Sequence, residues 1–129
     1  SKGGTILEAE KANAGGRTAS TDIAGFTGSG FIDMKDTGKM YIEWTYDAPK
    51  AGQYLLEFRY TLGRDEMLPA KLYLNSKDTG EIVFWTSGKK GNWVWDRKIV
   101  DIKKGQNKIR VEPNRQVILD HLNIISTEK

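Results

Sequence analysis

Residues 54–62 show the alternation of side chains that most restricts the fold of this chain. Every second position in the segment is large and apolar: Tyr54, Leu56, Phe58, Tyr60 and Leu62. The positions between them include Glu57 and Arg59, whose charges favour the opposite environment. Because successive side chains of an extended chain point to opposite faces, the segment predicts a half-buried β-strand. No helical periodicity competes with this pattern.

About nine segments with strand character follow one another at the spacing typical of β-sandwiches. They cover residues 5–9, 31–34, 39–46, 54–62, 71–75, 81–85, 93–102, 107–112 and 117–125. Turns separate them, and 14 glycines suit many short connections. The segment from Asn13 to Gly30 is a long irregular loop, which in a compact domain is usually functional or held in place by a contact. The predicted fold is all-β, a β-sandwich jelly-roll of two antiparallel sheets.

Length and composition limit the possible functions. The 129 residues suffice for one domain, which we place at residues 5–129, with residues 1–4 as a linker or a leftover of cloning. The absence of cysteine excludes disulfides, thiolate zinc sites and thiol nucleophiles. No apolar run approaches the ~20 residues that span a membrane. The net charge of +3 arises from interleaved acidic and basic residues, unlike the concentrated basic face of a nucleic-acid binder. We therefore expect neither nucleic acid nor a membrane as partner.

Glu8 and Glu10 are separated by one residue, so on a strand both carboxylates leave the same face. Like charges side by side repel, and a hard divalent cation with oxygen ligands relieves the repulsion. The alternative is a pair of solvated surface glutamates. From spacing alone, both interpretations stay open.

Trp93 and Trp95 lie two residues apart behind Lys89 and Lys90. They are either core anchors or a stacking platform beside cations. We expect Trp93 to be exposed and Trp95 to lie in the core. Since the two tryptophans have the opposite parity to Val100 and Ile102, this arrangement requires a bulge within residues 96–98. Trp44 and Trp85 are expected to pack in the core or on a sheet face.

Several segments together resemble the carbohydrate-binding modules of families 6 and 35. The matching segments, in family order, are residues 7–10, 25–34, 48–54, 58–60, 88–95, 104–110 and 119–122. They include Leu7-Glu8-Ala9-Glu10, Gly28-Ser29-Gly30-Phe31 and Leu119-Asp120-His121-Leu122. The resemblance implies a jelly-roll carried beside a glycan-degrading catalytic domain, with polysaccharide or oligosaccharide as ligand. We expect a monomeric module that is secreted, or extracellular, as part of a larger protein.

The resemblance also implies site residues. Glu8, Glu10 and Asp120, with loop carbonyls, would bind a structural calcium ion (Ca²⁺) that ties the loop 13–30 to both ends of the chain. The sugar-binding positions of the family map to Phe31, Trp93 and Ile118, with a place in the core as the alternative for Phe31. Isoleucine cannot hydrogen-bond a hydroxyl, and only Val94 separates the two tryptophans, where family members commonly have two residues.

Polar contacts to a ligand are expected from neighbouring loops. The candidates are Arg64, Lys89, Asn114 and Arg115, with Lys90 beside them. A rim of this kind favours an anionic or sulfated glycan, because guanidinium groups bind carboxylates and sulfates in a bidentate manner. Taken one by one, these residues are also explained as ordinary solvated loop charges. A second site is possible on a concave sheet face, where Tyr41, Glu43 and Arg59 alternate outward.

No catalytic residues are predicted. The chain has one histidine, His121, placed on the outer face of the last strand, and it lacks a nucleophile-elbow pattern. A carboxylate pair for glycoside cleavage is a spatial feature that spacing does not reveal, and Glu8 and Glu10 are better explained by an ion. The alternatives to a non-catalytic binding module are a small carbohydrate-active enzyme, or a β-domain that binds single-stranded nucleic acid or protein by stacking.

Overall fold

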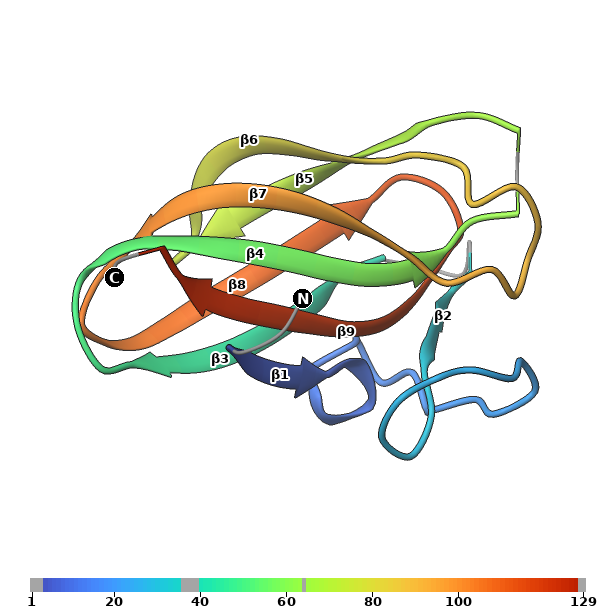
Figure 1. The fold of residues 1–129 in the computed structure, drawn as a ribbon, viewed down its shortest axis with the longest axis horizontal. Helices are drawn as coiled ribbons and strands as arrows, with labels where there is room; N and C mark the ends of the chain where they lie inside the picture. The colour runs from blue at the N-terminus through green and yellow to red at the C-terminus, as the bar shows by residue number, and fades with distance from the viewer. Residues whose placement is uncertain (1–3, 36–39, 64, 128–129) are drawn as a thin grey trace.

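A computed structural model describes residues 4–35, 40–63 and 65–127, and it confirms the predicted sandwich of two antiparallel sheets (Figure 1). Residues 1–3 of the expected linker or cloning leftover lie outside the described part. The strands are β1 (Thr5–Glu8), β2 (Ile32–Met34), β3 (Ile42–Ala48), β4 (Gly52–Thr61), β5 (Leu68–Leu74), β6 (Lys77–Phe84), β7 (Val94–Ile102), β8 (Gly105–Pro113) and β9 (Val117–Ser126). One 3-10 turn, η1 (Ala9–Lys11), follows β1.

One sheet has the order β1-β9-β4-β7, with β2 also paired to β9, and the other has the order β3-β8-β5-β6. We call them the β9 sheet and the β8 sheet. The core lies between them and is rich in aromatic rings, with Phe58 in contact with both Trp44 and Phe84. The large apolar side chains of β4 face this core, as the alternation in the sequence predicts. The side chains between them lie on the outer surface of the β9 sheet, since successive residues of a strand point to opposite faces.

The connections β4–β5, β6–β7 and β8–β9 meet at one end of the sandwich, at the right in Figure 1, which we call the loop end. β2 and the loop 13–30 lie beside it. The loop is irregular, as predicted, and two isolated bridges fasten it, from Asn13 to Glu43 and from Ser20 to Phe31.

A bulge in the pairing of β4 with β9 positions the most buried charges. Arg59 pairs with His121 and Tyr60 pairs with Leu119, so Asp120 is the extra residue of β9. Bulges re-aim side chains and increase local twist. Here Asp120 and His121 both become buried polar residues beneath the loop 13–30, instead of alternating between core and solvent.

The prediction of a bulge within residues 96–98 is wrong. β7 pairs with β4 in one unbroken register from Val94 to Ile102. Trp95 consequently faces outward and is 39% exposed, which contradicts the expectation that it lies in the core. Trp85 is 57% exposed beyond the end of β6, whereas Trp44 is buried as expected.

The second site proposed for Tyr41, Glu43 and Arg59 is not formed by these three residues together. Glu43 belongs to β3 of the β8 sheet and Tyr41 directly precedes that strand, whereas Arg59 lies on β4 of the β9 sheet. The outward faces of the two sheets point away from each other in a sandwich. Tyr41 instead stacks under Arg110, with the guanidinium carbon 3.8 Å from the ring centroid.

Candidate functional site

An acidic cluster lies where β1 ends beside the bulge of β9. Carboxylate oxygens of Glu8 and Asp120 and a ring nitrogen of His121 lie within 4.8 Å of one another. Thr27, from the long loop, reaches into the cluster. Its amide donates to Asp120 Oδ1 at 2.9 Å, and its hydroxyl oxygen lies 2.7 Å from Glu8 Oε1 and 2.9 Å from both Asp120 Oδ2 and His121 Nδ1. The loop 13–30 is therefore fixed to both ends of the chain through one threonine.

Glu10 lies next to this cluster on η1. Its Oε2 accepts hydrogen bonds from the backbone amide and the hydroxyl of Ser29, at 2.8 and 3.3 Å. Its Oε1 is buried without a hydrogen-bond partner among the described residues. The three carboxylates predicted from sequence are thus gathered around the segment 27–29. His121 is an addition to the predicted set: it lies opposite Glu8 in the register of β1 with β9, a pairing that spacing in the sequence does not reveal.

The electrostatics of the cluster differ between its members. Burial raises the pKa of Glu8, and the charges of Glu10 and Asp120 add to this effect, while the hydrogen bond from Thr27 opposes it. Burial also disfavours ionisation of Asp120, yet hydrogen bonds from His121, Arg59 and Thr27 outweigh it and lower the pKa of Asp120. Asp120 is therefore stabilised as a carboxylate, whereas the ionised form of Glu8 is disfavoured.

The donors present fit a hard cation. Ca²⁺ is bound by oxygen ligands, and carboxylates are its usual charged ligands. Glu8, Glu10 and Asp120 bring three negative charges together, against which the described contacts place one guanidinium, that of Arg59, 2.7 Å from Asp120 Oδ2. The partnerless Oε1 of Glu10 is the kind of buried oxygen that an ion would satisfy.

Gly28 leaves room for these carboxylates. Its φ is +63°, and a Cβ at this position would lie 2.3 Å from Glu10 Oε2 and 2.9 Å from Glu8 Oε2. Gly16 has a similar φ of +86° and open space around it. We expect Gly28→Ala to lower the free energy of unfolding by about 2–4 kcal/mol, from backbone strain plus overpacking.

The matched Gly16→Ala variant should lower the free energy of unfolding by only about 1 kcal/mol, from backbone strain alone. Urea denaturation of both variants separates the two contributions. Equal losses in the two variants would show that the carboxylates do not constrain Gly28.

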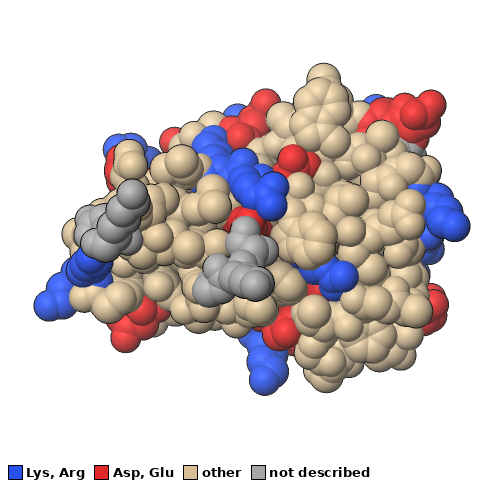
Figure 2. All heavy atoms as spheres, in the orientation of Figure 1, with Lys and Arg blue, Asp and Glu red and all other residues tan. Residues whose placement is uncertain are grey.

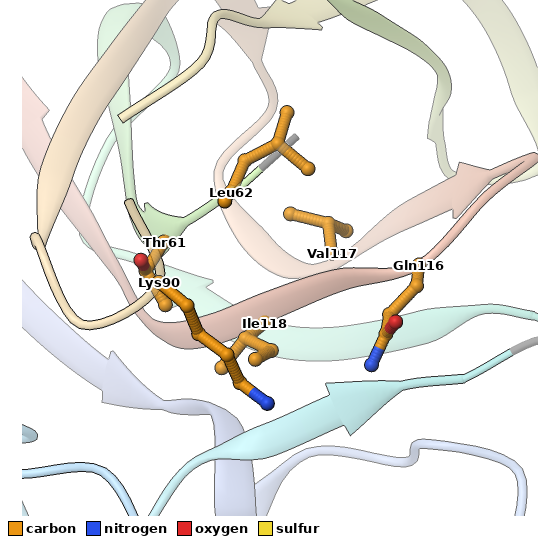
Figure 3. A pocket seen from close by; sticks show the side chains of 7 residues that line it. Thr61, Leu62, Lys90, Gln116, Val117 and Ile118 are labelled. Carbon is orange, nitrogen blue, oxygen red and sulfur yellow. The ribbon is translucent and has the colours of Figure 1, made fainter. Parts of the chain in front are cut away.

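A cavity of about 180 Å³ opens at the loop end, between the end of β4, the start of β9 and the turn before Gly91. Its walls are Thr61, Leu62, Gly63, Lys90, Gln116, Val117 and Ile118. The nitrogen-bearing ends of Lys90 and Gln116 lie on the same side of Ile118 (Figure 3). The cavity thus has an apolar floor and a polar margin with one ammonium group.

The cavity contains Ile118 but few of the other predicted ligand residues. Lys90 lines it, whereas Lys89 contributes its backbone oxygen to hydrogen bonds from Ser87 and Asn92. Arg115 donates to Glu66 at 2.6 Å, and Asn114 is exposed outside the cavity walls. The prediction for Arg64 lies outside the described residues. Side chains in a loop do not alternate regularly, so the sequence could not show which of Lys89 and Lys90 faces the cavity.

Phe31 is buried, with 1% of its surface exposed, so it offers no face to a sugar. Its ring packs between Phe26 and Trp93, at centroid distances of 6.0 and 5.7 Å. Trp93 itself is partly exposed, and its Nε1 donates to the Ala24 carbonyl at 2.8 Å. The predicted stacking pair is therefore a small cluster beneath the loop, with Trp93 as its partly exposed member.

The charges visible on one face do not gather into a stripe. Figure 2 shows basic and acidic side chains scattered among neutral ones. Among the described residues, no helix is long and apolar enough to cross a membrane.

Comparison with known proteins shows which solved structures this geometry resembles. No protein-family profile matches the sequence. A family 35 carbohydrate-binding module from Clostridium thermocellum superimposes with a TM-score of 0.89 at 27% identity, covering 97% of this chain and 99% of that one. The chain resembles a family 35 carbohydrate-binding module. The structural matches over whole chains are binding modules, which confirms the prediction of a non-catalytic domain. The resemblance to family 6 stays a prediction.

Other relatives align with this chain over a short part of much longer chains. A cycloisomaltooligosaccharide glucanotransferase from Niallia circulans is 32% identical over 93 residues, 72% of this module and 10% of that enzyme. An uncharacterised Listeria monocytogenes protein, solved with glucose, magnesium and calcium, matches with a TM-score of 0.86 at 27% identity, covering 95% of the module and 12% of that chain. The module spans 10–13% of the length of the curated relatives it matches.

Proposed function

We propose that this chain is a carbohydrate-binding module that directs an attached glycan-degrading enzyme, outside the cell, to an anionic or sulfated polysaccharide. The observation that carries the proposal is the loop-end cavity, where the ammonium of Lys90 stands beside an apolar floor. Small-ligand sites are typically apolar hollows with a few polar groups that fix orientation.

The shape and chemistry of the cavity suit one sugar unit. The C–H side of a pyranose is apolar, and the apolar part of the cavity wall comes from Leu62, Val117 and Ile118, which are 1–4% exposed and so offer only a small contact at its floor. Gln116 brings an amide oxygen that can accept from a hydroxyl, while its Nε2 donates to Asp33 Oδ1 at 2.7 Å, and the buried Thr61 hydroxyl is occupied by the amide of Gly91. Ile118 occupies the position of an expected asparagine, so the remaining polar contacts fall to Gln116 and Lys90.

Trp93 supplies aromatic stacking beside the cavity in this proposal. It follows Lys90 by three residues, and the amide of the intervening Gly91 donates to Thr61 Oγ1 in the cavity wall. Aromatic faces bind the apolar side of sugars, and the polar edge of tryptophan tolerates water. In this proposal the predicted Asn114 and Arg115 serve as outer contacts for a longer ligand.

Ca²⁺ is proposed as a structural ion held by Glu8, Glu10 and Asp120. The acidic cluster supports this, as does the Listeria relative, whose structure was determined with calcium and magnesium. The ion would supply positive charge to a cluster of carboxylates. The chain's own residues set the loop 13–30 against β9 through Thr27.

The binding proposal is tested by affinity electrophoresis in gels containing alginate, dextran sulfate or neutral dextran. We expect retardation in at least one of the two anionic gels. Lys90→Met should weaken that binding about tenfold, the value of a charge-assisted hydrogen bond of about 1.4 kcal/mol or more. Lys104→Met, on an exposed turn before β8, is the matched control and should bind as the wild type does.

Two outcomes would contradict the proposal. Equal retardation of Lys90→Met and wild type would remove the cavity from the binding site. Retardation in neutral dextran alone would refute the anionic ligand class while leaving the binding module intact.

A further inference from the structure

Arg59 lies between the acidic cluster and the two partly exposed tryptophans, and it contacts both. Its Nη1 donates to Asp120 Oδ2 at 2.7 Å and to the Gly25 carbonyl at 2.8 Å. Its guanidinium carbon lies 5.2 Å from the ring centroid of Trp93 and 5.3 Å from that of Trp95. One side chain thus joins a proposed cation ligand to the proposed stacking residue.

The segment 24–27 makes the same connection through the backbone. Trp93 Nε1 donates to the Ala24 carbonyl, Arg59 donates to that of Gly25, and Thr27 donates its amide to Asp120. Gly25 has a φ of +99°, and a Cβ there would lie 2.8 Å from Trp93 Cδ1. The indole therefore rests directly on the loop that the acidic cluster holds.

We propose that Arg59 is a positioning residue that couples the cation site to Trp93, so that cation binding orders the tryptophan and raises glycan affinity. The inference rests on the proposed function. Arg59 is 14% exposed, and its Nε is buried without a hydrogen-bond partner among the described residues. The guanidinium is held by Asp120, Gly25 and the two rings, so a change at Asp120 is transmitted to Trp93.

The coupling works through a shared carboxylate. Asp120 is both a proposed ligand and the partner of Arg59, so whatever positions its oxygens also positions the guanidinium. Without a cation, repulsion among Glu8, Glu10 and Asp120 opposes the packing of the segment 27–29 against them. Coupling is reciprocal in equilibrium binding and typically changes affinity by about 5- to 150-fold.

The test uses Ca²⁺ alone and needs no glycan. In a Trp85→Phe background, acrylamide quenching reports mainly on Trp93 and Trp95, because Trp44 is buried. Ca²⁺ should reduce quenching in this background. In Arg59→Met and in Arg59→Lys, calorimetry should still detect Ca²⁺ binding, while the Ca²⁺-induced decrease in quenching is lost.

Arg110→Met is the matched control, because Arg110 also stacks on an aromatic ring and pairs with a carboxylate, but on the opposite sheet. It should keep the full Ca²⁺ response. Thermal melts check that each variant is folded. A Ca²⁺ response that persists in both Arg59 variants would overturn the coupling, as would the absence of Ca²⁺ binding to the wild type. Both results are independent of whether the module binds alginate or dextran sulfate.

Discussion

Asp120→Asn is expected to lower the free energy of unfolding by about 3–5 kcal/mol, the cost of removing one partner of a buried ion pair. Asp120 is fully buried, and its carboxylate accepts hydrogen bonds from Arg59 Nη1 and the Thr27 amide. An asparagine keeps the shape but leaves the guanidinium without its counter-charge. The loss should therefore occur with or without added Ca²⁺.

Guanidinium chloride denaturation checks this prediction, with Asp101→Asn as control, since Asp101 is an exposed aspartate on β7 of the same sheet. The pH dependence gives a second test. Because the pKa of Asp120 is lowered by folding, its contribution is complete above the usual aspartate pKa and is lost as the pH falls through the folded value. The difference between wild type and variant should shrink in acid. A loss below about 1 kcal/mol at neutral pH would contradict a structural role for the pair.

Removal of bound Ca²⁺ by a chelator is expected to lower the Tm by on the order of 10 °C. A ligand that binds only the folded state at 100 to 1,000 times its Kd stabilises that state by about 2.7–4.1 kcal/mol. For a domain of this size, each kcal/mol shifts the Tm by several degrees. Differential scanning fluorimetry with EDTA, then with excess Ca²⁺, measures the shift and its reversal. An unchanged Tm would show that no bound Ca²⁺ stabilises the fold.

Glu8→Gln should have opposite effects on the Tm in the absence and in the presence of Ca²⁺. Burial and the charges of Glu10 and Asp120 raise the pKa of Glu8, so the ionised carboxylate destabilises the cation-free fold. Its contribution is most favourable below the usual glutamate pKa and is lost as the pH rises through the raised folded value. At neutral pH without Ca²⁺, Glu8→Gln should melt at or above the wild-type temperature, and with Ca²⁺ below it. Glu81→Gln, at an exposed position of β6, should leave both values unchanged.

Much of the architecture was predictable from the sequence, because strand periodicity is local. The alternation in residues 54–62 gave β4 and its core face, and the turn spacing gave two antiparallel sheets. The pair Glu8 and Glu10 indicated a cluster of like charge, but the reason given from strand parity was wrong, because β1 ends at Glu8 and Glu10 lies on η1. Trp44 was also placed correctly, because its neighbours continue the same alternation.

The exposure of the other aromatic residues was decided by tertiary structure. Trp95 faces outward because β7 pairs with β4 without a bulge, and Phe31 is buried because the loop 13–30 folds over it. Neither fact follows from local parity, since one depends on register with a distant strand and the other on how a loop closes. Lys90 lines the cavity and Lys89 does not, which likewise depends on how a loop closes.

The sequence by itself determined a β-sandwich with an acidic pair near its start and two tryptophans behind a lysine pair. Only the tertiary structure decided that β1 pairs Glu8 with His121, that a bulge in β9 adds Asp120 beside them, and that Arg59 joins this cluster to Trp93 and Trp95. A bulge changes the face of every residue beyond it, so one inserted residue decides which side chains meet. These contacts link positions 34 to 113 residues apart, so they depend on how distant strands of the β9 sheet pair and on how the loop 13–30 folds over that sheet.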